Sequence, residues 1–264
     1  MIEIRKYPRT PHLQGSRLQP GDEDLDQVPF DEIRGRWIVV EEKLDGANAG
    51  LRFDESGRLF LQSRGHFLTG GVREKHFDLF KQWATAHSWC LWERLGQRYA
   101  LFGEWLFAKH TVFYDALPHY FLEFDVVDLD SGDFLSTPRR RQLLQGVPIV
   151  SVPVLYRGRA TTLDDVSGMV GRSLYKSPAW REALIESCAE QGVGREQAWK
   201  ETDESDEMEG LYVKVEEKGR VVARYKWIRA SFLTAVIDSG THWLRRPIVP
   251  NRLAAGVSLF GGPP

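Results

Sequence analysis

EEKLDGAN, residues 41–48, directly follows the apolar run WIVV at residues 37–40. A short apolar run that ends in a glycine turn is typical of a buried strand. We therefore expect Lys43 at the end of a strand and Asp45-Gly46 in the turn that follows it. Strand ends often place reactive side chains in a cleft, although the same pattern also occurs in surface hairpins with a solvated lysine. The rest of the sequence has to distinguish these two possibilities.

The composition indicates a globular chain with a sizeable core and little net charge. The 264 residues suffice for one large domain or two small ones, and 42% of them are apolar and 12% aromatic. Charged residues make up 27% of the chain, and the formal net charge is -2. The chain therefore lacks the overall basic charge that is typical of many nucleic-acid-binding proteins, and a nucleic-acid site would have to be a local basic groove.

The sequence carries no recognisable signal for secretion or membrane insertion. Cys90 and Cys188 fit neither a disulfide framework nor a zinc cluster, and we expect both thiols to be reduced and packed. Residues 1–10 lack the apolar core of a signal peptide, and no run approaches the roughly 18 to 20 apolar residues of a membrane span. We therefore expect a soluble, cytoplasmic protein that makes no membrane contact.

Residues 1–35 are polar and rich in proline, which is typical of an extended arm leading into the first strand. The back half of this arm, GDEDLDQ at residues 21–27, is acidic, whereas the front half is basic. The basic half is either a solvated lead-in or one side of a groove for phosphate or substrate. Its basic residues are Arg5, Lys6, Arg9, His12 and Arg17.

Two predicted strands follow the opening motif, and a third predicted strand carries an acidic residue, Glu104. Residues 49–53 and 58–62 flank the turn DESG and predict a hairpin. Arg64 leaves the second strand beside a glycine, where an arginine is well placed to hold a phosphate or a ribose. Glu104 interrupts the apolar strand expected at residues 98–107. Because burying an unpaired carboxylate is costly, Glu104 needs a lysine, a metal ion or a sugar hydroxyl nearby and is a site candidate.

A helix should begin with Thr137 as its capping residue and Pro138 in its first position. The arginines at residues 139–141 in its first turn oppose the helix dipole, and we favour a solvated face for them over a nucleic-acid contact. Residues 201–207, ETDESDE, predict an acidic, exposed loop. Other expected elements are amphipathic helices over residues 73–95, a strand over 120–128 and helices over 164–170 and 179–189.

The last informative stretch, residues 209–229, predicts a hairpin with strands at 209–216 and 220–228. Alternation places Arg224 and Lys226 on the same face of the second strand. Two cations on one face of an apolar strand need an anion opposite them. Phosphate fits that requirement better than a chance carboxylate.

Five ordered blocks in these elements resemble the signature of the covalent nucleotidyltransferases, which are the ATP-dependent DNA and RNA ligases and the mRNA capping enzymes. Each block is weak alone, whereas their order, spacing and strand context are specific. The family usually has lysine where Arg224 stands, so the charge is kept but the geometry changes. The blocks are Lys43-Leu44-Asp45-Gly46, Phe102-Gly103-Glu104, Phe124-Asp125, Glu209-Gly210-Leu211-Tyr212-Val213-Lys214 and Arg224-Tyr225-Lys226.

The resemblance implies an α+β nucleotidyltransferase domain, similar to the ATP-grasp type, with mainly antiparallel sheets flanked by helices and no OB-fold. We expect this domain to span residues 1–229, including the arm at 1–35. A short C-terminal tail, residues 230–264, would follow. This tail could pack as a short helix and an extended strap, touch RNA, or begin a truncated domain.

The resemblance also implies the chemistry of Lys43, which would attack the α-phosphate of ATP to form lysyl-AMP. A free lysine is protonated at neutral pH, so neighbouring cations would have to lower its pKa. The expected cations are Lys226, Arg224 and a bound metal ion. Mg²⁺ (or Mn²⁺) would neutralise the phosphates, and Glu209 resembles the family's metal ligand.

The remaining assignments follow from residues that match the family's blocks. Phe124 resembles the aromatic residue that stacks on adenine, with Phe121 as a second candidate. Glu42 would accept a hydrogen bond from the adenine amino group, and guanine has a carbonyl there, so ATP is favoured over GTP. Lys226, and less clearly Arg224, would hold the α-phosphate. The other assigned nucleotide contacts are Glu104 to the ribose, Arg64 to ribose or phosphate, and Asp45, Gly46, Asn48 and Lys214.

Two features favour the RNA ligase branch. The first block continues to Asn48, where RNA ligases often have asparagine and DNA ligases usually have arginine. Only residues 227–264 follow the last block, too few to close an OB-fold. We therefore expect an RNA-repair enzyme, a monomer, that joins RNA 3′-hydroxyl and 5′-phosphate ends through lysyl-AMP and RNA-adenylate, with a possible end-healing kinase or phosphatase partner. The alternatives are a DNA ligase or capping enzyme with its OB-fold on another chain, or a non-catalytic RNA-binding relative.

Overall fold

The computed structural model describes residues 2–18, 27–239 and 246–261. Its strands are β1 (His12–Leu13), β2 (Gln27–Val28), β3 (Trp37–Lys43), β4 (Ala47–Phe53), β5 (Leu59–Ser63), β6 (Tyr99–Trp105), β7 (Phe121–Asp128), β8 (Phe134–Leu135), β9 (Val150–Ser151), β10 (Val154–Arg159), β11 (Gly210–Glu217) and β12 (Arg220–Ile228). Its helices are η1 (Phe30–Glu32), η2 (Val72–Phe77), α1 (Asp78–Ala86), α2 (Ser88–Leu95), α3 (Thr137–Leu143), α4 (Asp164–Ser167), α5 (Trp180–Glu190), α6 (Arg195–Lys200) and α7 (Ala230–Asp238).

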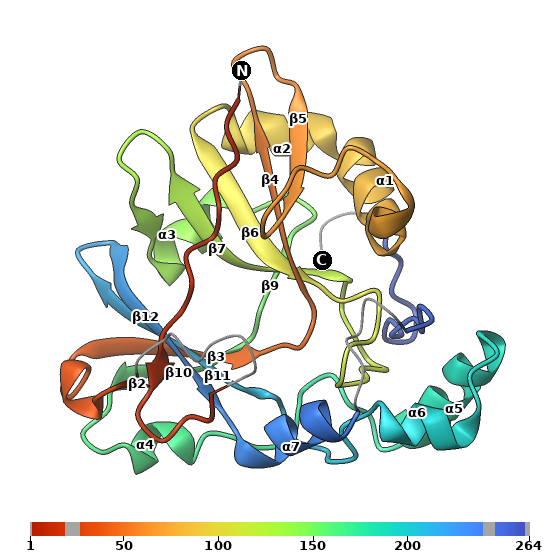
Figure 1. The fold of residues 1–264 in the computed structure, drawn as a ribbon. Coiled ribbons are helices and arrows are strands. Elements are labelled where there is room, and N and C mark those ends of the chain that lie inside the picture. The colour runs from red at the N-terminus through yellow and green to blue at the C-terminus, as the bar shows by residue number, and fades with distance from the viewer. Residues whose placement is uncertain (1, 19–26, 240–245, 262–264) are drawn as a thin grey trace.

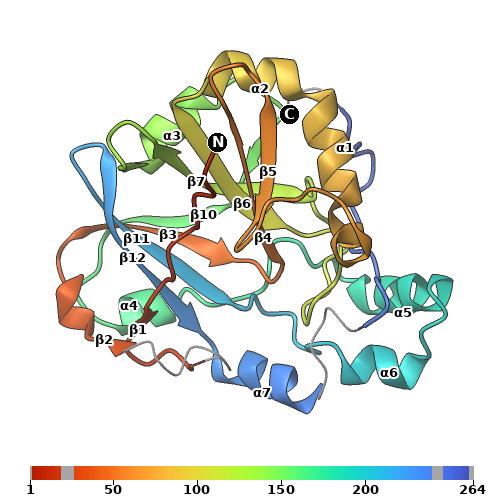
Figure 2. The ribbon, with the colours of Figure 1, turned by 45° about the horizontal axis from the view of Figure 1, so that its top comes forward.

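Within the described residues the strands form one 12-stranded sheet, whose main path runs β10-β3-β11-β12-β8-β7-β6-β4-β5. Neighbours along this path are antiparallel. Figure 1 and Figure 2 show two groups of strands, β4 to β7 in one and β3, β10, β11 and β12 in the other. The predicted α+β fold is confirmed, and the described strands form no closed barrel. None of the described helices is long and apolar enough to cross a membrane.

Each group of strands has its own apolar core on its outer side. The helices α1 and α2 cover β4 and β6, with the Phe80 ring 5.2 Å from that of Trp105 and the Trp92 ring 5.5 Å from that of Phe53, between ring centres. On the other group, the arm, η1 and α4 cover β3 and β11. Because both outer faces are covered by apolar layers, the inner faces are left to carry the polar side chains.

The alternation of β3 decides which of its side chains face inward. Ile38 and Val40 belong to the outer core, whereas Glu41 and Lys43 have the opposite parity. The register of β3 with β11 pairs Lys43 with Gly210. The end of β3 is thereby brought next to the start of β11, where two of the predicted blocks meet.

The N-terminal arm crosses both groups of strands, as Figure 1 shows. Tyr7 packs its ring 5.2 Å from Phe102 and 5.1 Å from Phe124, between ring centres. Farther along, His12 pairs in parallel with Lys226, and the Lys226 N–H donates to the Pro11 carbonyl at 3.0 Å. The arm is therefore part of the folded body over its described residues.

Some elements differ from the prediction. The strand β10 and the helix α6 have no counterpart among the predicted elements. Ser136, and not Thr137, occupies the N-cap of α3, where the backbone is still extended. The Thr137 N–H and hydroxyl both donate to Glu216 Oε1 at 2.6 Å. The loop predicted to be exposed at residues 201–207 is buried in its first part, where Asp203 pairs with Arg229.

Residues 246–261 pack onto the body as an extended segment. Asn251 accepts a hydrogen bond from the Tyr114 N–H at 2.9 Å and donates to the Leu106 carbonyl at 2.7 Å. Leu259 joins the core beneath α1 and α2. Of the alternatives for the tail, the structure shows a helix, α7, and this packed strap.

Candidate active site

A cavity of about 1000 Å³ lies between the two groups of strands. It is bordered by the end of β3, the turn after it, β4 to β6, the N-terminal arm and residues 246–248. The predicted site residues on its wall are Glu42, Lys43, Gly46, Asn48, Arg64, Glu104, Phe124 and Lys226. The fold thus brings side chains from distant parts of the chain onto one surface.

Lys43 ends β3, and its amine lies against Glu209. The Lys43 Nζ donates to both carboxylate oxygens of Glu209, at 2.8 and 2.7 Å. The pairing of Lys43 with Gly210 explains this contact, because it places the residue before Gly210 beside the lysine. Glu209 is almost completely buried, so the lysine is its main source of charge compensation.

The charges around Lys43 hold its amine in the protonated form. Burial opposes the ammonium, but Glu209, Glu104 and Asp45 together outweigh burial, so the pKa of Lys43 is raised. The expectation that neighbouring cations lower the pKa of Lys43 is wrong for the protein by itself, because carboxylates dominate its surroundings. A nucleophilic amine therefore requires another cation to engage these carboxylates.

Two buried carboxylates next to Lys43, Glu104 on the cavity wall and Glu209 against the lysine amine, suit a divalent cation. Burial raises the pKa of Glu104 to about 8 and that of Glu209 to about 7, although Lys43 opposes both shifts. Among the described residues, no cluster of three or more His, Cys, Asp or Glu side chains forms a closed metal cage. Mg²⁺ usually takes one or two protein carboxylates and completes its shell with water and substrate phosphates. The donor set fits Mg²⁺ or Mn²⁺ held jointly by Glu209 and a phosphate.

Gly46 and Asp45 shape the turn between β3 and β4. A Cβ on Gly46 would lie 2.8 Å from a backbone oxygen of β6 and 2.9 Å from Glu104 Cγ, so only glycine allows this close approach. Asp45 does not line the cavity, because its Oδ2 accepts the N–H groups of Thr111 and Val112, both at 2.7 Å. Asp45 therefore positions the turn, and a direct contact with nucleotide does not fit its placement.

Asn48 presents an acceptor beside Glu104. The register of β4 and β6 pairs these two residues. Asn48 Oδ1 is buried, and no described group donates a hydrogen bond to it. An unsatisfied buried acceptor is costly unless a ligand completes it. Together with Glu104, it suits a ligand that carries hydroxyl groups.

Of the two candidate stacking residues, only Phe124 borders the cavity. Its ring meets the Tyr7 ring edge-on, with 5.1 Å between ring centres. Phe121 instead is fully buried, with Phe80 and Trp83 at 5.1 and 5.6 Å. Residues three apart in a strand lie on opposite faces, and the packing of α1 against Phe121 identifies which face of β7 is the outer one.

The cations of the cavity wall come from separate elements. Lys226 is buried on β12, next to the point where the arm joins the sheet. Arg64 follows β5 and is exposed at the edge of the cavity. Of the two cations predicted to contact phosphate here, one is therefore buried and the other is solvated.

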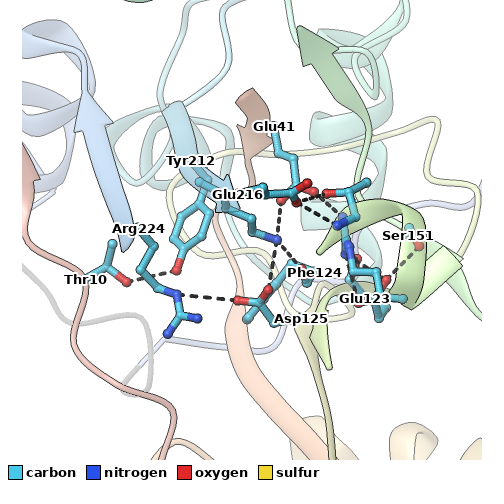
Figure 3. A network of polar contacts seen from close by, with 12 residues as sticks. Thr10, Glu41, Glu123, Phe124, Asp125, Ser151, Tyr212, Glu216 and Arg224 are labelled. Atoms are coloured by element: carbon cyan, nitrogen blue, oxygen red, sulfur yellow. Dashed lines mark hydrogen bonds and ion pairs between the residues drawn. The ribbon is translucent and has the colours of Figure 1, made fainter. Parts of the chain in front are cut away.

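Lys214 and Arg224 lie outside the cavity, in a buried ion cluster shown in Figure 3. The cluster consists of Glu41, Glu123, Asp125, Arg140, Lys214 and Arg224. Lys214 Nζ lies 2.9 Å from Glu41 Oε2 and 3.1 Å from Asp125 Oδ1. Arg224 Nε lies 3.8 Å from Asp125 Oδ2, and its guanidinium is 3.8 Å from the centre of the Phe134 ring. The contacts with nucleotide predicted for Lys214 and Arg224 do not fit, because protein carboxylates already face these cations.

Arg140 is the completely buried centre of this cluster. It pairs with Glu41 and donates to both oxygens of Glu123, at 2.8 and 2.9 Å. The solvated position predicted for it is therefore wrong. Burial alone would raise the pKa of Asp125, but Lys214, Arg224 and Arg140 outweigh burial and lower it.

Sequence reasoning missed Tyr7 and Glu41 as residues that support the site. The Tyr7 hydroxyl donates to Asp125 and lies 2.6 Å from the Tyr212 hydroxyl, so it closes the cluster on the side of the arm. Glu41 carried a usable signal, because it is an acid inside an apolar strand, as is Glu104. Tyr7 carried none, since its partners are remote in sequence.

Glu42 directs its carboxylate toward the loop after α4. Its Oε1 accepts from the Ser173 hydroxyl at 2.5 Å and its Oε2 from the Leu174 N–H at 3.2 Å. Neighbouring residues of a strand point to opposite faces, so Glu42 and Lys43 leave β3 on different sides. Burial raises the pKa of Glu42 to about 7. The residue still borders the cavity, and its contact with the adenine amino group stays a prediction.

Comparisons with known proteins identify the type of fold. Residues 36–228 match the family described as RNA ligase. Several solved structures of the Naegleria gruberi RNA ligase are similar: an apo variant has 18% identity and a TM-score of 0.57, covering 89% of this chain and 58% of that one. A variant with ATP and Mn has 18% identity and a TM-score of 0.54, covering 79% and 54%. The ligase with PPi has 20% identity and a TM-score of 0.54, covering 89% and 58%.

This chain therefore spans less than two thirds of the length of those ligase chains. At such identities the similarity concerns the fold. No curated protein sequence matches the chain.

Proposed function

Because this chain belongs to the RNA ligase family, we propose that it is an ATP-dependent RNA ligase that joins a 3′-hydroxyl to a 5′-phosphate. The observation that carries the proposal is the setting of Lys43, whose amine is held by Glu209 on the wall of a cavity of about 1000 Å³. A lysine nucleophile, a carboxylate for a metal ion and an unsatisfied acceptor for a hydroxyl are the groups that an adenylyl transfer uses.

The cavity offers a consistent place for ATP. Phe124 is available for adenine, and Glu42 accepts at the edge of the same cavity. Glu104 and the unsatisfied Asn48 Oδ1 suit the ribose hydroxyls. Lys226 then faces the α-phosphate, with Arg64 at the rim. Asp45, Lys214 and Arg224 act on this site indirectly, by holding the turn and the ion cluster behind it.

The first step forms lysyl-AMP on Lys43. The amine loses a proton, its nitrogen bonds to the α-phosphorus, and the bond from that phosphorus to the pyrophosphate oxygen breaks, with the electron pair leaving on pyrophosphate. A divalent ion shared by Glu209 and the phosphates would supply the charge that favours a neutral amine and a stable leaving group. In the protein alone burial lowers the pKa of Lys43, but Glu209, Glu104 and Asp45 outweigh burial and raise it, so a divalent ion bound to these carboxylates would favour the neutral amine.

The later steps transfer AMP from Lys43 to an RNA 5′-phosphate and then release it when a 3′-hydroxyl attacks. The transfer to RNA restores the Lys43 amine, and the final attack forms the new phosphodiester. A ligase of this kind acts in RNA repair on ends that carry these groups. A separate end-healing kinase or phosphatase would supply them.

The decisive test is covalent labelling with ATP that carries ³²P in its α-phosphate, followed by a denaturing gel. We expect the wild-type protein with Mg²⁺ or Mn²⁺ to retain label, and Lys43→Ala to retain none. Label that survives in a folded Lys43→Ala protein would disprove the assignment of the nucleophile. Label from GTP in place of ATP would indicate a capping-type enzyme, and no label from either would indicate a non-catalytic relative.

The choice between nucleic acids needs matched substrates. Nicked duplexes and single strands of RNA and of DNA, each with a 3′-hydroxyl and a 5′-phosphate, should be sealed only or far better when they are RNA. Equal sealing of the DNA nick would contradict the RNA branch, and the labelling result would still stand.

A further inference from the structure

The open side of the cavity is lined by basic side chains. Of the described residues that line the cavity, the exposed ones that carry an ionisable side chain are Arg64, His66 and Lys75. Arg64 and His66 follow β5, and Lys75 lies in η2. None of the carboxylates in the described lining is exposed. A ligand that enters from solvent therefore passes cations and no exposed acid of the lining.

The N-terminal arm brings two more cations to this side. The Arg5 carbonyl accepts a hydrogen bond from Gln62 Nε2 at 2.8 Å, so Arg5 lies beside the end of β5, close to Arg64. Lys6 follows, and the two residues after it line the cavity. Arg5 and Lys6 are both exposed. The arm and the rim of the cavity together carry four cations, which we call the basic collar: Arg5, Lys6, Arg64 and Lys75.

The arm is fixed on both sides of its two cations, so the collar is part of the folded protein. Arg52 Nη2 on β4 donates to the Glu3 carbonyl at 2.6 Å, and Tyr7 is buried. Figure 1 shows this part of the arm beside β4. Burial and then Arg5 lower the pKa of Arg52, because the two positive charges lie close enough to repel each other.

The collar is not neutralised by neighbouring acids. Within the described ranges of the chain, none of its four side chains has a carboxylate within 4.0 Å. Glu74, next to Lys75 in sequence, accepts from the Gly70 N–H at 2.8 Å and pairs with Lys81 at 2.9 Å. Asp78 also pairs with Lys81, at 3.2 Å. The acids on this side are therefore engaged by a different cation.

A polyanion suits this arrangement better than a single phosphate. Exposed cations bind one small anion weakly, because water and salt screen each contact. A strand of nucleic acid instead meets several cations at once and releases counterions from each contacted phosphate. The formal net charge of the chain is -2, so cations gathered at the cavity mouth do not follow from an overall basic composition.

We propose that the basic collar binds successive backbone phosphates of the RNA strand whose end enters the cavity. The proposal rests on the proposed function and adds to it a binding surface outside the cavity. Arg5 and Lys6 precede residues 36–228, which match the RNA ligase family. The arm thus contributes to RNA binding from outside that range.

The test measures binding of a fluorescent, single-stranded 5′-phosphate RNA to the protein without ATP, by anisotropy at several salt concentrations. The collar variants are Arg5→Gln together with Lys6→Gln, and Lys75→Gln alone. Arg64 stays unchanged in both, because the proposed ATP site uses it. The measurement needs no chemical step, so it reports on the collar separately from the ligase reaction.

The expected result is a weaker dependence on salt. Each phosphate contact with a single strand contributes about 0.7 to the slope of log affinity against log salt. Loss of two contacts in the double variant should reduce this slope by about 1.4, so between about 50 and 200 mM salt the wild-type affinity should fall about sevenfold more than that of the variant. Lys75→Gln should reduce the slope by about 0.7.

The matched control is Arg141→Gln together with Arg157→Gln. These arginines are exposed on α3 and β10, and neither lines the cavity. The control removes the same charge and should keep the wild-type slope. A control slope that falls as far as that of the double variant would assign the effect to net charge and overturn the proposal. A double variant with the wild-type slope, or a wild-type protein that binds no RNA, would overturn it as well.

Two further measurements separate the collar from other causes. Arg5→Lys together with Lys6→Arg keeps both charges and should keep the slope, whereas a reduced slope would show that the arm acts only through its structure and would reject the collar. A 3′-hydroxyl RNA without the 5′-phosphate, measured in the same way, identifies which of the two strands the collar binds. If the wild-type protein forms no lysyl-AMP, the proposed function fails by itself, and the RNA-binding slopes still decide the collar.

Discussion

Replacing Lys214 by methionine should destabilise the fold without removing a contact to ATP. Lys214 is completely buried, and its amine faces Glu41 at 2.9 Å and Asp125 at 3.1 Å. Methionine fills similar space but leaves both carboxylates without their shared cation. Removing one partner of a buried ion pair costs about 3 to 5 kcal/mol. For a chain of this size we expect a decrease in melting temperature of about 6 °C or more.

The pH dependence of this effect follows from Asp125. Burial raises its pKa, but Lys214 and then the neighbouring arginines outweigh burial, so the native pKa lies below the ordinary value. A carboxyl group of this kind stabilises the folded state above its unfolded pKa of about 3.9, and this stabilisation is lost as the pH falls through the native pKa. The deficit of Lys214→Met should therefore be complete at pH 6 to 7 and should shrink below about pH 4.

The assay is urea unfolding of the ligand-free protein at several pH values, together with labelling by ATP below the melting temperature. Lys200→Met is the control, because Lys200 is exposed at the end of α6. The folded Lys214→Met protein should form lysyl-AMP with an affinity for ATP within a factor of about 3 of wild type. A loss of unfolding free energy below about 1 kcal/mol would contradict the role of Lys214 in the buried ion cluster. A large loss of ATP affinity in a fully stable variant would show that Lys214 is a nucleotide ligand after all.

Three more outcomes follow from the site. Gly46→Ala should cost about 2 to 4 kcal/mol of unfolding free energy, because its Cβ would lie 2.8 Å from a backbone oxygen, whereas Gly65→Ala meets nothing within 4 Å and should be nearly neutral. Chemical unfolding of both variants checks this difference. Burial raises the pKa of Glu104 to about 8, so the ligand-free protein should lose stability as the pH rises from about 4.5 to 8. Glu104→Gln should reduce that loss by on the order of 2 kcal/mol in melts across this range, and an unchanged slope would contradict the assignment. Phe124→Leu should raise the KM for ATP about tenfold with little change in stability, while Phe121→Leu should lower stability and leave the KM near wild type. Steady-state adenylylation and thermal melts separate the two.

Local patterns predicted much of the fold because they report on single elements. The apolar run at residues 37–40 predicted a buried strand, and the structure confirms it in β3, where Ile38, Val39 and Val40 are buried. The order of the blocks identified strands whose ends meet at the cavity. Such patterns depend only on residues that are close in sequence, because the apolar residues on one face of a strand or helix recur with a fixed period.

The errors concern charges whose partners are distant in sequence. Arg140 was placed in solvent because its position in a helix N-terminus says nothing of Glu41, which lies 99 residues away. Arg224 and Lys226 were correctly given the same face of β12, yet residues two apart in a strand lie roughly 6 to 7 Å apart. Over that distance Lys226 borders the cavity, while Arg224 lies in the ion cluster beside Asp125. The pKa of Lys43 depends on which charges lie nearest, and only the three-dimensional arrangement shows that these are carboxylates.

The parallel pairing of His12 with Lys226 also has a consequence for how the protein is made. The arm is synthesised long before β12, the strand that it joins. Contacts of such long sequence separation form late in folding. Tyr7 and Lys226 therefore reach their places only after the whole sheet is synthesised, and a nascent chain that already contains Lys43 has no complete cavity. The order of synthesis thus leaves the cavity around Lys43 incomplete until β12 has been made.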